Sequence, residues 1–254
     1  MLHYSLTGNG ELVLLIHGLL GSHRNLAGLT KFLSEEYRVC SIDLPNHGDS
    51  PSSESMDFKN IAASVCDVLD HLKISSPIRL LGHSLGGKVA MTFALAYPGR
   101  VSHLLIEDIT PVAYPPHHRD ILDALLAIDI DILASREEAE VALRDAIPDQ
   151  MTRQFVLTNL RRKTDGFMWK ANIQSISECY GQIMAAVDTD AYQPYIGKTM
   201  FVAGQKSRYI TADMSEAILS VFPSAQFRQI ADAGHWIHAE KPQVFSALAK
   251  RFFN

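Results

Sequence analysis

The chain has 254 residues, of which 47% are hydrophobic and 20% charged, and its formal net charge is -5. This length suits one large domain, or one domain with an insertion, and the composition is that of an ordinary globular protein. The negative charge argues against a surface for polyanions, and no apolar run approaches the ~18 residues of a membrane span. The first eight residues lack the basic start and apolar core of a signal peptide. We therefore expect a cytoplasmic protein, monomeric or homodimeric, that binds neither nucleic acid nor membranes.

Alternating strands and helices are predicted over the first 110 residues. Continuous apolar runs, typical of strands buried on both faces of a parallel sheet, occupy residues 11–16, 39–44, 77–81 and 104–106. Helical spacing of apolar residues predicts helices near residues 26–33 and 61–72, and a run of small residues predicts another over 88–97. The sequence therefore indicates an α/β fold with a mostly parallel sheet covered on both faces.

The pattern changes between residues 111 and 195, where no stretch has the character of a buried strand. Four helices are expected there: near 121–126, from Ser135, near 155–160 and over 173–187. Ser135 and Glu138 have the spacing of a capping box. Strands at 199–203 and 226–230 and helices at 213–222 and 244–253 then resume the α/β alternation. We therefore expect a core of residues 1–110 and 196–254 with an inserted helical cap of residues 111–195.

The most informative stretch is Gly82-His83-Ser84-Leu85-Gly86. Gly-x-Ser-x-Gly between a strand and a helix is typical of a nucleophile elbow, a strained turn that exposes the serine Oγ. The flanking glycines suit a turn too tight for a Cβ atom. Ser84 is thus the predicted nucleophile, and the backbone N–H of Leu85 is a predicted donor to an oxyanion.

Two further loops follow predicted strands. His17-Gly18-Leu19-Leu20-Gly21 is suited to expose a second oxyanion donor, the N–H of Leu19. Serine needs an adjacent base, and His235, in a short loop after the last strand, is the predicted one. Loops at the carboxyl ends of parallel strands share one edge of the sheet, so these groups should converge. The loop from Asp43 to Ser50 is interpreted as a self-hydrogen-bonded turn that shapes the sheet.

These stretches together resemble the α/β-hydrolase-fold serine hydrolases along nearly the whole chain. The match is carried by residues 17–21, 43–48, 82–86 and 234–236. Residues 107–111, the small helical cap and residues 204–210 narrow the resemblance to the YbfF-type bacterial esterases and their mitochondrial relatives. The resemblance implies hydrolysis of carboxylic esters, with no cofactor.

The acidic residue that should orient His235 departs from the commonest pattern of this fold. Many α/β hydrolases place it three residues after a glycine that follows the cap, and here that position is Ser207. A hydroxyl cannot stabilise an imidazolium as a carboxylate does. Asp108, at the end of the strand after the elbow helix, is therefore the predicted acid. Its neighbour Glu107 should point to the opposite face of the strand.

Two other carboxylates are less suited to act as the acid. Asp213 lies near the usual acid loop but should already be inside a helix. Asp232 is close to His235 in sequence but is expected to point elsewhere.

Substrate contacts are less determined by the sequence. The candidates are His17, Tyr114, Trp169, Arg208 and Trp236. Most aromatic residues of the cap are expected to pack it onto the core, with a few lining an apolar pocket. Basic residues of the cap and of the stretch after it could meet an anion such as the phosphates of coenzyme A, but a solvated charged face is the simpler interpretation. They are Arg119, Arg161, Arg162, Lys163, Lys206 and Arg208. His117 and His118 are adjacent, a poor spacing for metal ligands, so no metal site is expected.

The predicted function is hydrolysis of small or acyl-chain esters, extending to acyl-CoA thioesters, with a small-molecule substrate as the only partner. A same-fold lyase of the menaquinone-synthase type, acting by proton abstraction, is the alternative, and Ser207 at the usual acid position argues against it. A non-catalytic binding protein is disfavoured because Ser84, His235 and the glycine-rich loop are all present.

The cysteines favour a reducing compartment. Cys40, Cys66 and Cys179 are odd in number and far apart, so we expect free, mostly buried thiols without a disulfide or metal role.

Overall fold

A computed structural model describes all residues, 1–254. Its centre is a seven-stranded sheet with the strand order β1-β3-β2-β4-β5-β8-β9. The strands are β1 (Tyr4–Thr7), β2 (Leu12–Ile16), β3 (Arg38–Ile42), β4 (Ile78–His83), β5 (Val101–Glu107), β8 (Lys198–Gly204) and β9 (Ala225–Ile230). Only β1 runs antiparallel to its neighbour, and every other pair is parallel. The predicted mostly parallel sheet is confirmed.

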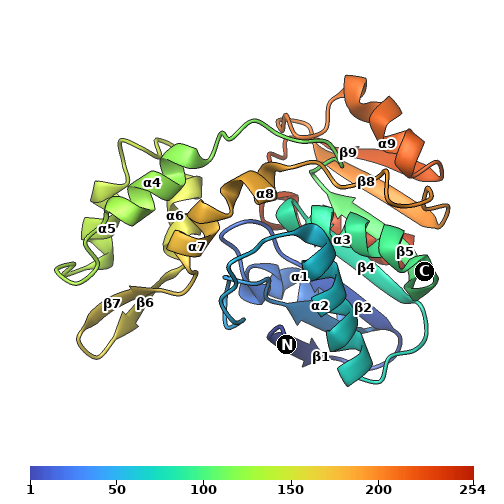
Figure 1. The fold of residues 1–254 in the computed structure, drawn as a ribbon, viewed down its shortest axis with the longest axis horizontal. Coiled ribbons are helices and arrows are strands. Elements are labelled where there is room, and N and C mark those ends of the chain that lie inside the picture. The colour runs from blue at the N-terminus through green and yellow to red at the C-terminus, as the bar shows by residue number, and fades with distance from the viewer.

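Helices cover both faces of this sheet (Figure 1). They are α1 (Ala27–Leu33), α2 (Phe58–His71), α3 (Leu85–Ala96), α9 (Ser215–Val221), α10 (Ile237–Glu240) and α11 (Pro242–Phe253). Apolar residues of α2, α3 and α9 pack on one face, and those of α1, α10 and α11 on the other. Strand β2 shows why its sequence is continuously apolar. Leu14 and Ile16 enter the first of these cores, whereas Val13 and Leu15 enter the second.

The carboxyl ends of the central strands align at one edge of the sheet. Ile16 pairs with Gly82, and Gly82 pairs with Ile106. The residues that follow these strands therefore start from neighbouring positions on that edge.

The segment between β5 and β8 leaves the sheet (Figure 1, green to gold). It contains α4 (Arg119–Ala127), α5 (Arg136–Ala142), α6 (Gln150–Leu157), β6 (Leu160–Lys163), β7 (Gly166–Trp169), α7 (Ile173–Glu178) and α8 (Tyr180–Met184). The β6–β7 hairpin was not predicted. Its first strand carries three exposed basic residues, so it lacks the apolar run that marks a buried strand. The helix expected over 173–187 is divided into two at Cys179.

Polar contacts attach this inserted segment to the loop that follows β3. The N–H of Asn172 donates to the carbonyl of Asn46 at 2.8 Å, and the Lys170 ammonium lies 3.0 Å from an Asp49 oxygen. A third contact reaches the loop after β2, where the Asn159 side chain donates to the carbonyl of Leu20 at 2.6 Å. The insertion therefore rests on the same edge of the sheet where the central strands end.

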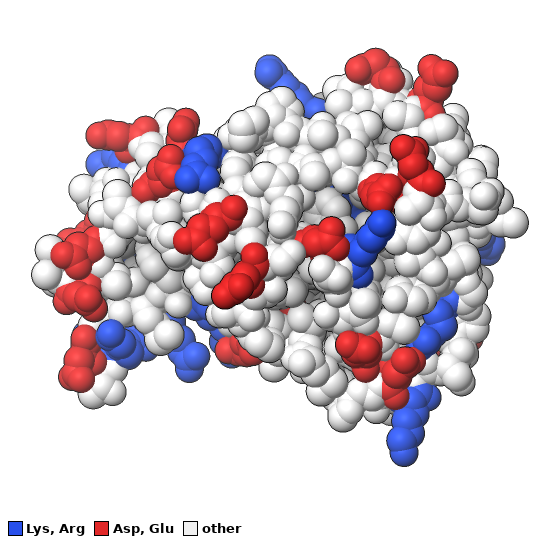
Figure 2. All heavy atoms as spheres, viewed as in Figure 1, with Lys and Arg blue, Asp and Glu red and all other residues white.

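The surface carries charges of both signs. In the view of Figure 2, acidic and basic side chains are interspersed over this face, in keeping with the modest net charge. No helix of the structure combines the length and the apolarity that crossing a bilayer requires.

Candidate active site

Ser84 stands at the sharp turn between β4 and α3. Its backbone has φ 52° and ψ -120°, a conformation that non-glycine residues rarely adopt. The turn is held from both sides, because the N–H of Ser84 donates to the carbonyl of Glu107 at 3.0 Å and its own carbonyl accepts from Gly87 at 2.8 Å. The surrounding structure thus imposes the strain, and this is the geometry of a nucleophile elbow.

The glycines flanking Ser84 are required by close backbone approaches. A Cβ atom on Gly82 would lie 2.2 Å from the carbonyl oxygen of Gly86. One on Gly86 would lie 2.4 Å from the carbonyl oxygens of Ile16 and His17. Because these neighbours are backbone atoms at the centre of the sheet, they cannot move aside cheaply.

We therefore expect Gly86→Ala to lower the free energy of unfolding by roughly 3 kcal/mol, through overpacking between α3 and β2. Urea unfolding followed by circular dichroism measures this change. Gly99→Ala is the matched control, since a Cβ there meets nothing within 4 Å. Equal stabilities of the two variants would contradict the close approach.

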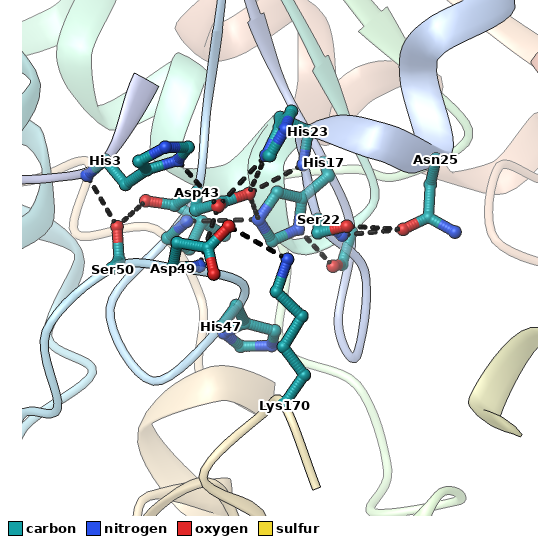
Figure 3. Close-up of polar contacts among 12 residues, drawn as sticks. His3, His17, Ser22, His23, Asn25, Asp43, His47, Asp49, Ser50 and Lys170 are labelled. Atoms are coloured by element: carbon teal, nitrogen blue, oxygen red, sulfur yellow. Dashed lines mark hydrogen bonds and ion pairs between the residues drawn. The ribbon is translucent and has the colours of Figure 1, made fainter. Parts of the chain in front are cut away.

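The loop after β2 is held by two buried histidines (Figure 3). Nε2 of His47 accepts from the N–H of Leu20 at 3.0 Å, and Leu20 has a positive φ of 57°. Nε2 of His17 accepts from the N–H of Leu44 at 3.0 Å, so its Nδ1 donates to the Gly18 carbonyl at 2.8 Å. Burial lowers the pKa of His17 to about 4 and that of His47 to about 3, so both rings are neutral near pH 7 and can accept these bonds.

Two backbone N–H groups are available beside Ser84. Leu85 is the first residue of α3, so its N–H has no partner within the helix. Leu19 lies in the held loop, and both leucines line a small cavity together with Ser84. The two residues predicted as oxyanion donors thus lie together with Ser84 in the wall of one cavity.

His235 and Asp108 meet across the sheet edge. Nδ1 of His235 donates to Oδ2 of Asp108 at 2.7 Å, and the carboxylate is fully buried. Asp108 accepts two more hydrogen bonds, from the N–H of Gly204 at 3.0 Å and from the hydroxyl of Ser207. Ser207, at the position where the acid is usual, therefore acts as a donor to the displaced carboxylate.

Burial favours the uncharged form of each partner. It lowers the pKa of His235 and raises that of Asp108 to about 7, while the bonds from Ser207 and Gly204 lower the latter. Because the two groups share a hydrogen bond, they titrate as one unit that carries a single negative charge. Burial disfavours that charge, so the unit takes up its first proton near neutral pH.

Side chains that the sequence analysis did not single out hold the His235 loop. Glu240 accepts from the N–H of Gly234 at 2.7 Å and from that of Trp236 at 3.2 Å. The ring of Tyr209 stacks on His235, with centroids 4.0 Å apart and planes inclined by 23°. The Tyr209 hydroxyl contacts Nε2 of His118 at 3.0 Å. These contacts fix the orientation of the imidazole.

Two adjoining cavities share Ser84, Leu19, His118 and Tyr209 in their walls. The larger has a volume of about 210 Å³ and its lining is mainly apolar. It is lined by Leu19, Leu20, His83, Ser84, His118, Ile121, Thr152, Phe155, Val156, Tyr209, His235 and Trp236. Since Ile121, Thr152, Phe155 and Val156 belong to the insertion, that segment forms part of its wall.

Of the predicted substrate contacts, Trp236 lines the larger cavity and Tyr114 the smaller. His17, Trp169 and Arg208 line neither cavity, so their role as substrate contacts stays a prediction. The His17 ring is turned into the core by its two backbone bonds. Trp169 belongs to the β6–β7 hairpin, and Arg208 is exposed to solvent.

The other carboxylates lie away from His235. Oε1 of Glu107 accepts from the backbone N–H of His238 at 2.9 Å and lies 2.8 Å from Nδ1 of its ring, so this carboxylate is paired with His238 and not with His235. Asp232 pairs with Lys206 at 3.4 Å on the surface, and Asp213 is exposed within a short 3-10 helix.

Comparisons with known proteins agree with this geometry. The family model described as alpha/beta hydrolase fold matches residues 11–242. The sn-1-specific diacylglycerol lipase ABHD11 of Danio rerio is 35% identical over 94% of this chain and 77% of its own length. Esterase YbfF of Escherichia coli (strain K12) is 30% identical over 97% of this chain and 94% of its own. A solved structure, a marine microorganism esterase, has a TM-score of 0.93 at 33% identity, covering 99% of this chain and 98% of that one. The chain belongs to the α/β-hydrolase family.

Proposed function

We propose that this chain is a serine hydrolase that cleaves carboxylic esters through an acyl-enzyme. Ser84 is the nucleophile, His235 the general base and Asp108 the carboxylate that orients it. The observation that carries the proposal is the 2.7 Å hydrogen bond between His235 and Asp108, beside a strained serine in the wall of the same cavity. The names of the relatives, esterase and diacylglycerol lipase, agree with this chemistry.

The mechanism follows from the placement of each group. His235 removes the Ser84 proton as Oγ attacks the ester carbonyl, and Asp108 stabilises the imidazolium that forms. The N–H groups of Leu19 and Leu85 hold the tetrahedral oxyanion, each contributing about 3 kcal/mol. His235 then protonates the leaving alcohol. A water molecule, activated by the same histidine, releases the acid and regenerates Ser84.

The mainly apolar cavity favours an acyl or alkyl group as the main recognition element. We propose that residues 111–195 act as a cap on a core of residues 1–110 and 196–254, since they supply part of the cavity wall. Acyl-CoA thioesters extend the proposed substrates, because the same acyl transfer applies to them. The three cysteines are free, in keeping with a cytoplasmic, reducing location.

The function is tested with a chain-length series of p-nitrophenyl esters, a matched series of acyl-CoA thioesters and a fluorophosphonate probe. We expect ester turnover and a single covalent adduct, mapped by peptide mass spectrometry to Ser84. Absence of turnover with every ester, or an adduct on another serine, would overturn the proposal. The thioester series decides only the wider substrate range.

The raised pKa of Asp108 predicts the pH profile. The active form has an ionised Asp108 and a neutral His235, so kcat/KM should decline as the pH falls through the pKa of about 7. The Ser207 hydroxyl lowers this pKa, so Ser207→Ala should move the acid limb to higher pH. Ser224→Ala, an exposed serine, is the control and should leave the limb in place. An unchanged limb in Ser207→Ala would show that its hydroxyl does not influence the pair.

A further inference from the structure

Four metal-ligating side chains from separate parts of the chain meet beside the loop that follows β3 (Figure 3). Oδ2 of Asp43 lies 3.0 Å from Nδ1 of His3 and 3.0 Å from Nδ1 of His23. With Asp49 included, one ligand atom of each of the four residues lies within 4.8 Å of the others. None of them lines the cavities at Ser84, so the cluster is separate from the proposed catalytic centre.

We propose that His3, His23, Asp43 and Asp49 bind one divalent transition-metal ion, with Zn²⁺ as the best match. Two imidazole nitrogens and two carboxylate oxygens form a donor set that suits zinc. Tetrahedral bonds of about 2.0–2.2 Å place ligand atoms about 3.3 Å apart. Nδ1 of His3 and Nδ1 of His23 each lie 3.0 Å from Oδ2 of Asp43, so each of these two pairs needs to separate by only a few tenths of an ångström to reach that spacing.

The central carboxylate is held in place before any ion arrives. Asp43 is fully buried, and its oxygens accept from the backbone N–H of His23 at 2.7 Å and of Asp49 at 2.8 Å. Ser50 fixes the flanking backbone, because its hydroxyl donates to the Asp43 carbonyl at 2.6 Å and accepts from the N–H of His3 at 2.9 Å. Such outer hydrogen bonds orient the ligands of metal sites.

The site is open on the side of His3. The His3 side chain is 36% exposed, and a surface hollow is lined by His3, Asp49 and Ser50 among others. Without an ion, both Nδ1 atoms contact the Asp43 carboxylate as hydrogen-bond donors. When an ion binds, each neutral ring carries its proton on Nε2 instead, so neutral imidazoles release no net proton.

Metal binding at this site would be coupled to the contact between insertion and core. Asp49 pairs with Lys170 of the inserted segment at 3.0 Å, so the ion and the ammonium compete for its carboxylate. Removing Lys170 should therefore strengthen zinc binding.

The proposal is tested by titrating Zn²⁺ into chelator-treated full-length protein against a chromophoric competitor, at a pH where imidazoles are neutral. We expect the wild-type protein to bind one equivalent of Zn²⁺ tightly. Asn places an amide nitrogen near the position of Nδ1, so His3→Asn and His23→Asn keep a donor to Asp43 but lose a ligand. Each should bind zinc at least about 100-fold more weakly, beyond what outer partners usually contribute. His71→Asn, an exposed histidine outside the cluster, should bind like the wild type.

Several results would overturn the site. One is the absence of a stoichiometric equivalent in the wild type, and another is unchanged affinity in both Asn variants. A third is loss of the equivalent in His238→Asn instead, because His238 belongs to a second cluster with His83 and Glu107. The variant Lys170→Met tests the role of Asp49 independently of the other three ligands. Tighter zinc binding supports Asp49 as a ligand, and unchanged zinc binding removes it from the proposed ligand set. Circular dichroism of each variant confirms that the fold persists.

Discussion

Ser84→Ala is expected to lower kcat for p-nitrophenyl esters by about a million-fold. Without Oγ there is no acyl-enzyme, and water must attack the ester directly. The backbone N–H groups of Leu19 and Leu85 remain, so a residual rate above that of water should persist. Steady-state kinetics together with the loss of the fluorophosphonate adduct measures the effect.

The serine and the histidine should act as one unit. His235→Ala alone is expected to cost nearly as much as Ser84→Ala, and the double variant should be no slower than either. Ser224→Ala, on the surface, serves as the control for preparation and folding. If the Ser84 variant kept more than a few per cent of the activity, the nucleophile would have to lie elsewhere.

The core of the fold could be predicted because its strands are buried on both faces. Such strands are continuously apolar, as in β2, and this pattern stands out without knowledge of the partners. The structure of the inserted segment was harder to predict from the sequence. The first strand of the β6–β7 hairpin carries three exposed basic residues, and the apolar Phe-Met-Trp run of the second strand is too short to indicate a strand by itself. The turn of this hairpin depends on Gly166, whose φ is 118°.

The candidate site was predictable where residues follow strands. Ser84, Asp108 and His235 each come directly after a strand or in the next loop, and a parallel sheet brings such positions to one edge. The roles of Tyr209 and Glu240 could not be inferred in this way. Tyr209 lies in the loop after β8 and stacks on His235. Glu240 lies in α10 and accepts a hydrogen bond from Gly234, which precedes that helix in the chain. Neither contact has a signature in sequence spacing.

The histidine and aspartate cluster shows the same limit. Its members are separated by between 6 and 46 positions, and His3 directly precedes β1, the strand that runs antiparallel at the sheet edge. Sequence spacing predicted no metal site because it considers neighbours such as His117 and His118. The loop from Asp43 to Ser50 contains hydrogen bonds of its own, but the contacts of the Asp43 carboxylate with His3 and His23 become visible only in three dimensions.

Asp108→Asn is expected to lower kcat by about 10⁴-fold with little change in stability. Asn has the same shape, and its amide oxygen can still accept from the N–H of Gly204. Its amide nitrogen would then face Nδ1 of His235, where the carboxylate now accepts a hydrogen bond. The ring must place its proton on Nε2 to accept this bond, and Nε2 is then unable to take the proton of Ser84.

The outcome separates Asp108 from its rivals in the sequence. Asp213→Asn and Asp232→Asn are the matched controls, since both side chains are exposed and neither contacts His235. Each should stay within about twofold of wild-type kcat, as surface changes usually do. Full activity in Asp108→Asn with loss in either control would move the acid to that residue. A small loss in all three would mean that Ser207 and the stacked Tyr209 suffice to orient the imidazole, and that the displaced carboxylate serves only to tie β5 to β8.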